Sequence, residues 1–202
     1  MMIVMQKKYT KSAVRSRKEI SHDRIVEVAA RAIRRSGYDG TGVADIMKEA
    51  GLTHGGFYAH FASRDALLVE AGDRACADSV ALASRVVAAA PPGQALQAIM
   101  QAYLSPEHIS AIETGCPVSA LGSEMPRQSP EVRHAATLHI KEMIDLIARQ
   151  LPDWGKQQTH EQAMALLCAL IGTTMIARAV DDPALSEALR AATMKQFTPA
   201  AE

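Results

Sequence analysis

The chain has 202 residues, of which 48% are hydrophobic and 22% are charged, so it holds enough apolar side chains to bury a core. Its 22 lysines and arginines balance 22 acidic residues, and its three cysteines stand at unrelated spacings, which excludes a disulfide framework and a cysteine-based zinc site. No apolar run approaches the roughly 20 residues that a membrane span needs, so we expect a cytoplasmic protein. We also expect neither a cofactor nor a metal.

The N-terminal end of the chain is basic. Residues 1–37 contain ten lysines and arginines against three acidic residues, and residues 1–15 are predicted to form a flexible arm. Because the whole chain has no net charge, the remainder is acidic. A basic end on an acidic body suits a protein that touches a polyanion, although basic segments also act as mere solubilising ends.

The first predicted helix begins at Ser16 and ends at Gly37. Ser16 and Glu19 have the spacing of a capping box, in which a hydroxyl and a carboxylate bind the free amides of the first turn. Glycine is a common residue just past a helix end. Between these ends, apolar residues recur at helical spacing and form one face: Ile25, Val28, Ala29, Ala32 and Ile33.

Two short helices are predicted next, over 42–50 and 54–60, joined by a glycine turn. Thr53 stands at the N-cap position of the second helix. Phe57 and Phe61 are four residues apart, so they share one face, which we expect to pack against the first helix. Such a helix-turn-helix unit can lay its second helix in the major groove of DNA.

The outward face of the second short helix carries His54, Gly55 and Tyr58, with His60 at its edge. A glycine pair inside a helix costs on the order of 1 kcal/mol per glycine relative to alanine, which suits a backbone that must approach another molecule closely. The alternative for Tyr58 and His60 is a small aromatic cluster in the core.

Six further helices are predicted, and no stretch alternates with period two for long enough to form a strand. We therefore predict an all-α fold, with a three-helix DNA-binding domain over 16–62 that is fused through a long fourth helix to a larger helical body over 63–202. The six helices are expected over 63–90, 94–104, 117–127, 130–150, 158–180 and 183–197.

Residues of fixed type recur at fixed spacings through the head. They are Gly37-Tyr38-x-x-Thr41, Val43-x-x-Ile46, Ala50-Gly51-Leu52-Thr53, Phe57-Tyr58-x-His60-Phe61 and Ser63-Arg64-x-x-Leu67. With them, the stretch from Ile25 to Leu68 resembles the tetracycline-repressor (TetR) family. The resemblance implies a homodimeric repressor that binds a near-palindromic operator in double-stranded DNA and releases it when a small molecule binds to the body.

The resemblance also implies roles for individual residues of the head. Thr53 matches the cap of the recognition helix, and His54 with Gly55 stands at its base-reading start. Phosphate contacts fix the register on DNA, whereas contacts to base edges carry the sequence information. Four positions match phosphate contacts of the family: Thr41, Tyr58, His60 and Arg64.

The last two predicted helices correspond to the pair that forms a four-helix dimer bundle in the family. A dimer also fits the DNA, because two recognition helices must lie roughly 34–36 Å apart to meet successive major grooves. Burial of the same apolar faces within one chain is the alternative. The predicted interface residues are Leu166, Leu170, Thr174, Leu185 and Leu189.

An effector pocket is expected among the middle helices. Its candidate wall residues serve equally well as plain core, because methionine is first of all a pliable gap-filler. They are Tyr103, Cys116, Met125, His134, Leu138, Met143 and Met175.

Cys116 is singled out because it stands between Gly115 and Pro117. Proline favours the first position of a helix, so Cys116 is predicted at the N-cap, where helix amides favour a thiolate. The hypothesis is that Cys116 senses an oxidant or an electrophile, and the alternative is an inert, half-buried thiol. Cys76 and Cys168 are expected in the core.

Two other functional classes were weighed against the regulator. One is a thiol-dependent enzyme that uses Cys116 with His108 or His134 as its base. The other is a helical architectural protein that senses nothing. The sequence has no carboxylate pair, phosphate-cradling loop or nucleophile elbow, and His134 and His139 are too poorly spaced for a metal pair. We therefore predict a non-enzymatic DNA-binding regulator.

Overall fold

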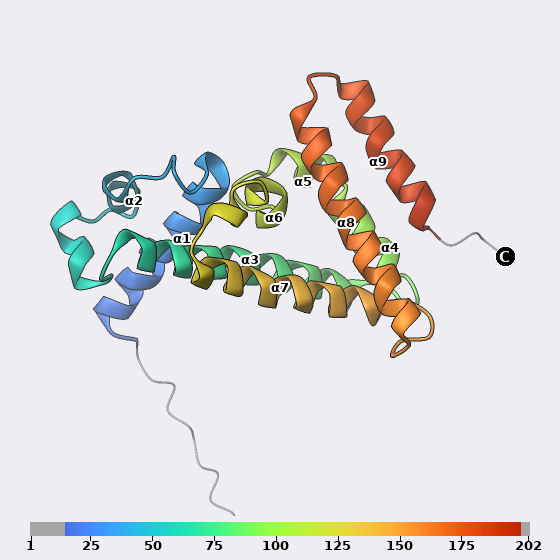
Figure 1. Cartoon of the computed structure of the whole chain (residues 1–202), viewed down its shortest axis with the longest axis horizontal. Coiled ribbons are helices and arrows are strands. Elements are labelled where there is room, and N and C mark those ends of the chain that lie inside the picture. Colours follow the sequence, from blue (N-terminus) through green and yellow to red (C-terminus); the bar gives the residue numbers. More distant parts are fainter. Residues whose placement is uncertain (1–14, 199–202) are drawn as a thin grey trace, which may run out of the picture.

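The computed structural model describes residues 15–198, and over that range the chain contains helices and no strand (Figure 1). The predicted all-α fold is therefore confirmed. Apart from Arg15, the predicted basic arm lies outside the described residues. The head consists of α1 (Arg17–Ser36), α2 (Val43–Glu49) and the short 3₁₀ helix η1 (His54–Ala59).

A long helix, α3 (Arg64–Ala89), leads from the head into the body. Its 26 residues span about 39 Å at 1.5 Å per residue. The remaining elements are α4 (Ala95–Tyr103), α5 (Pro106–Ser110), α6 (Pro117–Leu121), η2 (Met125–Arg127), α7 (Pro130–Ala148), α8 (Gln157–Ala179) and α9 (Pro183–Phe197).

The start and end of α1 follow the predicted chemistry. The Ser16 hydroxyl accepts a hydrogen bond from the Glu19 amide at 3.2 Å, and the Glu19 carboxylate accepts one from the Ser16 amide at 2.6 Å. At the other end Gly37 has a φ of 77°, a conformation that glycine adopts without the strain imposed by a Cβ. Both observations confirm the predicted bounds.

The core of the head is built by α1, α2, η1 and the first turns of α3. Its fully buried side chains include Ile25, Met47, Phe57 and Leu67. Leu121 of α6 and Val132 of α7 belong to the same cluster, so the body closes one side of the head. The domain boundary predicted at residues 62 and 63 stays a prediction, since this packing is continuous across it.

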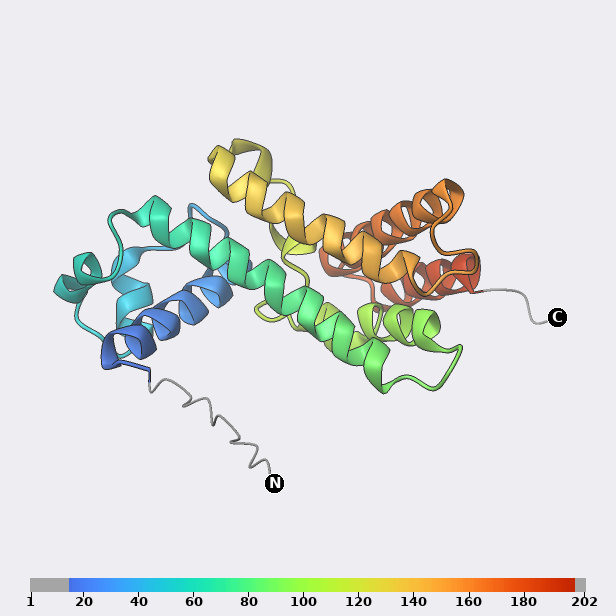
Figure 2. The same cartoon turned by 90° about the horizontal axis from the view of Figure 1, so that it is seen from below.

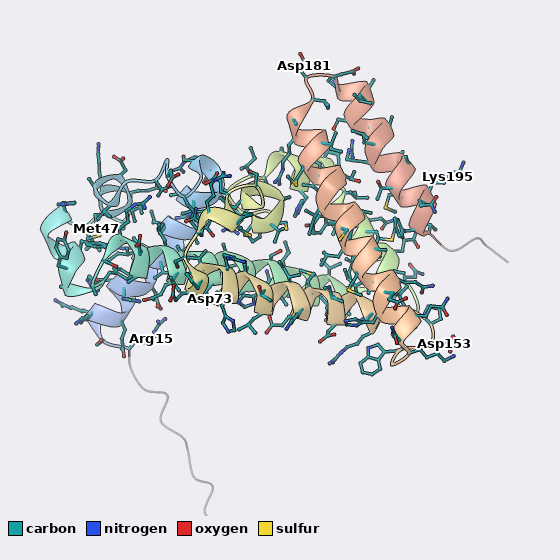
Figure 3. All side chains as sticks on the ribbon, in the orientation of Figure 1. Arg15, Met47, Asp73, Asp153, Asp181 and Lys195 are labelled. Carbon is teal, nitrogen blue, oxygen red and sulfur yellow. The ribbon has the colours of Figure 1, made fainter. Side chains whose placement is uncertain are left out.

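The body is organised around α3 and α7, which lie side by side (Figures 1 and 2). The antiparallel pair α8 and α9 lies at the end of the molecule remote from α2 and η1. Asp153 marks the turn before α8 and Asp181 the turn between α8 and α9 (Figure 3). The second core cluster fills the space between these helices and α4, with Met100, Ile147 and Leu170 fully buried.

The predicted dimer residues on α8 require a correction. Leu166, Leu170 and Thr174 are at most 2% exposed, because this face of α8 packs on the core of its own protomer. The three predicted residues therefore face the interior of their own chain, whereas the opposite face of α8 is apolar and exposed. That exposed face carries Met164, Cys168, Met175 and Ile176, and Leu185 of α9 is exposed as well.

The expectation about membrane spans also needs a correction. By length and composition alone, α8 is apolar enough to cross a membrane. The same properties are typical of a helix in a protein core, and one face of α8 packs against α6, α7 and α9.

Three local predictions differ from the structure. The helix expected over 54–60 is a 3₁₀ turn, and Thr53 stands at its N-cap without a side-chain hydrogen bond. The helix expected over 117–127 stops at Leu121, and the separate turn η2 follows after Gly122. The short helix α5 was not predicted, although Ser105 before Pro106 is a typical start: its hydroxyl accepts from the His108 amide at 3.1 Å.

Candidate functional site

The short helix η1 presents two different faces. Phe57 and Phe61 stack with ring centroids 5.6 Å apart and are buried, as predicted. Tyr58 points outward and is 74% exposed, so it does not belong to an aromatic core cluster. A phenol in this position can donate its hydroxyl to a molecule outside the protein.

His54 and Gly55 form the exposed N-terminal edge of η1. A Cβ built on Gly55 would meet no atom within 4 Å among the described residues. The protein itself therefore does not require glycine at this position. The open space is consistent with the predicted close approach of the Gly55 backbone to DNA.

Thr41 is placed differently from the expectation. Its side chain is buried at 4% exposure, and its hydroxyl donates to the Gly37 carbonyl at 2.8 Å. The hydroxyl closes the turn between α1 and α2 and faces away from solvent. A phosphate contact by the Thr41 hydroxyl would have to replace this bond, so the predicted role stays a prediction.

Arg64 also acts inside the protein. Its guanidinium donates to the carbonyls of Tyr38 and Thr41, which fastens the start of α3 to the α1–α2 turn. A phosphate contact by Arg64 would compete with these bonds, so the predicted role stays a prediction.

His60 directly follows η1 and lies near α1, with its ring centroid 6.0 Å from that of His22. Its Nδ1 is buried and has no hydrogen-bond partner among the described residues. Burial, together with the charges of His22 and Lys18, lowers the pKa of His60. The lowered pKa favours the neutral ring in the free protein, and the phosphate contact predicted for His60 stays a prediction.

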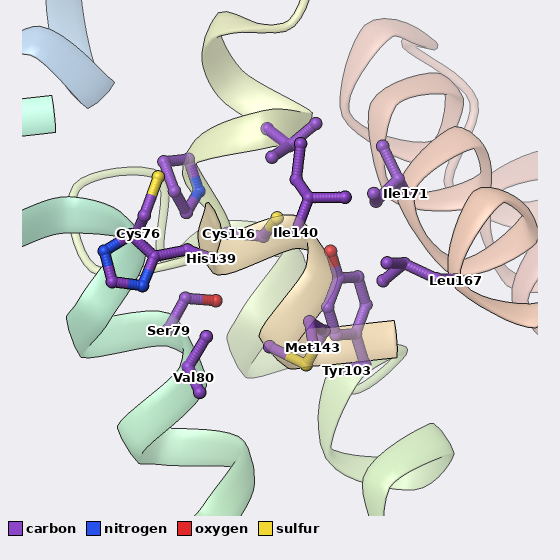
Figure 4. A pocket seen from close by; sticks show the side chains of 12 residues that line it. Cys76, Ser79, Val80, Tyr103, Cys116, His139, Ile140, Met143, Leu167 and Ile171 are labelled. Atoms are coloured by element: carbon purple, nitrogen blue, oxygen red, sulfur yellow. The ribbon is translucent and has the colours of Figure 1, made fainter. Parts of the chain in front are cut away.

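In the body, a small cavity of about 30 Å³ lies between α3, α4, α6, α7 and α8 (Figure 4). Three of the predicted pocket residues line it: Tyr103, Cys116 and Met143. Its other walls are mainly aliphatic, with Val80, Val118, Ile140, Leu167 and Ile171.

Four predicted pocket residues lie elsewhere. Met125 packs against the core of the head, and Met175 is on the exposed face of α8. His134 and Leu138 line an open groove between α1, α3 and α7, because they occupy the face of α7 opposite to Met143. The helical period predicts which residues share a face of a helix, but it does not tell which face points toward the cavity.

The cysteines divide differently from the expectation. Cys76 is buried, as predicted, but it also lines the cavity with Cys116, and burial raises its pKa to about 12. Cys168 is exposed, because it lies on the outer face of α8. Cys116 is 5% exposed and stands at the N-cap of α6, although this helix has only five residues.

The segment around Cys116 is held by backbone contacts. The Cys116 amide donates to Nε2 of His108 at 3.5 Å, and the Ser119 hydroxyl donates to the Cys116 carbonyl at 2.9 Å. Arg178 of α8 donates to the carbonyls of His108 and Ile109, each at 2.9 Å, and to the Ser119 hydroxyl at 3.0 Å. This guanidinium therefore fixes both short helices, α5 and α6.

Gly115 is required for the same packing. A Cβ at this position would lie 2.7 Å from Nη2 of Arg178 and 2.8 Å from the Ala111 carbonyl.

Burial first, and the charge of Arg178 second, lower the pKa of His108 to about 4. His108 is therefore neutral near pH 7, which leaves Nε2 free to accept the Cys116 amide.

The segment that carries Cys116 also touches the head through three polar contacts. Arg34 of α1 is 5% exposed and donates to the Gly115 carbonyl at 3.3 Å. Arg35 donates to Glu113 at 2.9 Å. Glu124 accepts a hydrogen bond from the Tyr38 amide at 2.8 Å. Sequence analysis missed these contacts, because each joins residues more than 70 positions apart.

His139 of α7 is bonded through both of its ring nitrogens. Its ring nitrogens bond Asp73 at 2.9 Å and Glu142 at 2.8 Å. Burial alone would lower the pKa of His139, but these two carboxylates outweigh it and raise the pKa. Among residues 15–198, no group of three or more metal-ligating side chains comes together.

Comparison with known protein families identifies the family to which the chain belongs. The family model of bacterial regulatory proteins of the TetR family matches residues 25–71. The C-terminal domain of LmrA/YxaF-like transcriptional regulators matches residues 92–197, which is more than half of the chain. The chain belongs to the TetR family. This TetR-family protein is therefore a DNA-binding transcriptional regulator, in agreement with the resemblance seen in its sequence.

Similar proteins share the whole architecture. The chain is 26% identical over 154 residues to the HTH-type transcriptional regulator LmrA of Bacillus subtilis. This match covers 75% of the chain and 82% of LmrA. A TetR transcriptional regulator from Chloroflexus aurantiacus superimposes with a TM-score of 0.75 at 22% identity, over 89% of this chain and 95% of that one. The reduced form of E. coli NemR superimposes with a TM-score of 0.73 at 18% identity, over 88% and 94%.

Proposed function

We propose that the protein is a cytoplasmic homodimeric repressor, which binds a near-palindromic operator and releases it when an effector occupies or modifies the cavity at Cys116. The contacts between the Cys116 segment and α1 carry this proposal. Gly115, next to Cys116, accepts from Arg34, and Glu124 accepts from the backbone at Tyr38, where α1 turns into α2. A change of the cavity that moves α6 must therefore break these bonds or move α1 with it.

The apolar outer face of α8 supports the homodimer. Ile176 is 50% exposed, Met164 39% and Leu185 45%, and an exposed apolar patch of this kind is typical of a protein interface. A Cβ on Gly172 of α8 would meet no atom within 4 Å in the part of the chain that the structure describes, so this glycine leaves room for the close approach of another helix.

The thiol hypothesis is tested with the intact protein on its own operator. First, DNA sequences that bind the protein are selected from a random pool. Peroxide or a quinone is then expected to release the selected DNA from the unmodified chain, and this response should fall at least tenfold in Cys116→Ser, because the sulfur that reacts is gone. Gel shift or fluorescence anisotropy measures the release.

Cys168 lies on the outer face of α8, which we propose as the dimer interface, so the oligomeric state of a variant at this position is verified first. Cys168→Ser then serves as the control, because this thiol does not line the cavity. It is expected to retain the response. If release persists unchanged in Cys116→Ser, the thiol is not the sensor, and a non-covalent effector of the same cavity is the remaining form of the proposal.

Two substitutions in η1 separate base contacts from phosphate contacts. His54→Ala is expected to change the consensus of the selected operators, because His54 is the exposed side chain at the start of η1, where glycines leave little else to contact a base edge. Tyr58→Phe is expected to weaken binding to all sequences by a similar factor, up to about tenfold, through the loss of one hydrogen bond to a phosphate. Binding selection measures both, and an unchanged consensus for His54→Ala would contradict the first expectation.

The two other functional classes give different results in these experiments. A thiol-dependent enzyme would turn over a substrate, and Cys116→Ala would abolish that activity. An architectural protein would bind DNA without any response to peroxide, to quinones or to metabolites added in a titration of the fluorescence of Trp154.

A further inference from the structure

The cavity at Cys116 contains one polar group without a partner. Tyr103 is 7% exposed, and within the described part of the chain its hydroxyl makes no hydrogen bond of normal geometry, although the Cys116 thiol lies beside it. Most buried polar groups in native proteins are hydrogen-bonded, so an unpaired phenol needs an explanation. A ligand that accepts a hydrogen bond from Tyr103 supplies one.

The Tyr103 hydroxyl points into the cavity, toward Cys116 and Ile140 (Figure 4). Its ring is fixed from behind by His108, which stacks on it with centroids 4.7 Å apart. Burial, and after it the neighbouring Cys116 sulfur, raises the pKa of Tyr103 well above its usual range. The phenol therefore keeps its proton and remains a hydrogen-bond donor at any physiological pH.

The size and the walls of the cavity limit what it takes. Its aliphatic lining suits an uncharged and mostly apolar molecule. Its volume of about 30 Å³ holds only a water-sized group, so a larger molecule enters only when a wall side chain moves. A second cavity of about 30 Å³ shares Ser79, Tyr103 and Met143 with the first. Methionine is pliable, so movement of Met143 can join the two spaces and admit a slightly larger molecule.

We propose that this cavity takes small α,β-unsaturated aldehydes and ketones, whose β-carbon is attacked by the Cys116 sulfur while the Tyr103 hydroxyl binds the carbonyl oxygen. The proposal deepens, and rests on, the proposed sensing role of Cys116. A nucleophile and a fixed donor on one apolar cavity match the two ends of an enone, whereas peroxide needs no such donor.

The step is an addition and consumes no oxidant. The thiol first loses its proton to solvent, and a sulfur lone pair then forms the S–C bond with the β-carbon. The electrons of the C=C bond move to the carbonyl oxygen, where the Tyr103 O–H stabilises the enolate. The α-carbon finally takes a proton from water, so the sum is the addition of S–H across the double bond.

Two alkylating reagents of similar size separate the role of Tyr103 from simple access to Cys116. Methyl vinyl ketone develops negative charge on oxygen as it reacts, whereas iodoacetamide reacts by displacement of iodide and forms no enolate. In Tyr103→Phe, the rate of Cys116 modification by methyl vinyl ketone should fall about tenfold or more relative to the rate with iodoacetamide. Timed quenching and peptide mass spectrometry of the full chain measure both rates at Cys116.

Ile171→Val is the control variant, since it alters the wall of the same cavity without removing a donor. It is expected to keep the ratio of the two rates. If Tyr103→Phe does not fold, the unmodified chain still tests the proposal: the ratio at Cys116 should exceed that of glutathione in the same buffer about tenfold. An unchanged ratio in Tyr103→Phe, a ratio equal to that of glutathione, or no reaction of Cys116 with methyl vinyl ketone overturns the proposal.

These rates are measured without DNA, so the two proposals fail separately. If Tyr103 accelerates the reaction but the adduct leaves operator binding intact, the sensing role falls and the ligand class stands. If peroxide releases the operator through Cys116 while Tyr103→Phe leaves the ratio unchanged, the ligand class falls and the sensing role stands.

Discussion

Replacement of Ile176 by glutamate is expected to give a monomer and to weaken operator binding at least 100-fold. Ile176 is 50% exposed on the outer face of α8, next to Met175, and a second copy of this face would bury it. A carboxylate placed there would lose its hydration on dimerisation without gaining a partner, and an unpaired buried charge is among the costliest defects in an interface. Loss of the dimer uncouples the two recognition helices, so each then binds its half-site alone.

Analytical ultracentrifugation gives the oligomeric state, and anisotropy with the selected operator gives the affinity. Leu138→Glu is a matched control, because Leu138 is 47% exposed but lies on the face of α7 that lines the groove with α1 and α3, not on the outer face of α8. This control should stay dimeric. A monomeric unmodified chain, or a dimer that survives Ile176→Glu, would contradict the proposed interface.

The head of this protein could be predicted from sequence because its determinants are local. The capping box of Ser16 and Glu19, the pair Phe57 and Phe61, and the glycine after α1 each act over a few residues, and the structure contains all of them. A helical period and a capping residue depend only on neighbours a few positions away, so both can be recognised in the sequence before the fold is known.

The body was predicted less well, because its faces are decided by partners far away in sequence. The period of α8 is clear, yet both of its faces are apolar, so the sequence could not tell that Leu166 faces inward and Met164 outward. Similarly, nothing near Arg34 reveals that its guanidinium bonds the carbonyl of Gly115, 81 residues away. Such contacts follow from packing, which sequence periodicity does not encode.

Acid is expected to destabilise the fold through His108, and the sign follows from its pKa. Burial and Arg178 lower the pKa of His108 in the folded chain to about 4, from 6.5 for an exposed histidine. Between these values the unfolded chain binds a proton that the folded chain does not bind, so the free energy of unfolding decreases as the pH falls. The stabilisation is complete above about pH 6.5 and is lost as the pH approaches 4, with a total of about 2 kcal/mol after allowance for solvent screening at the ring edge.

His108→Gln isolates this contribution, because glutamine stays neutral and keeps an acceptor for the Cys116 amide. Urea unfolding is followed by circular dichroism at several pH values between 7.5 and 4. The protein concentration is kept fixed, because the stability of a dimer depends on concentration. The free energy of unfolding of the unmodified chain should fall by about 2 kcal/mol more than that of His108→Gln over this range. Parallel profiles would mean that His108 is already free to take up a proton in the folded chain.

His139 is a control with the opposite sign, since its pKa is raised and its contribution to stability is lost as the pH rises. His139→Gln should therefore not remove the loss of stability in acid. Protonation of His108 also removes the acceptor of the Cys116 amide, so the same titration should loosen the turn that joins the cavity to Arg34.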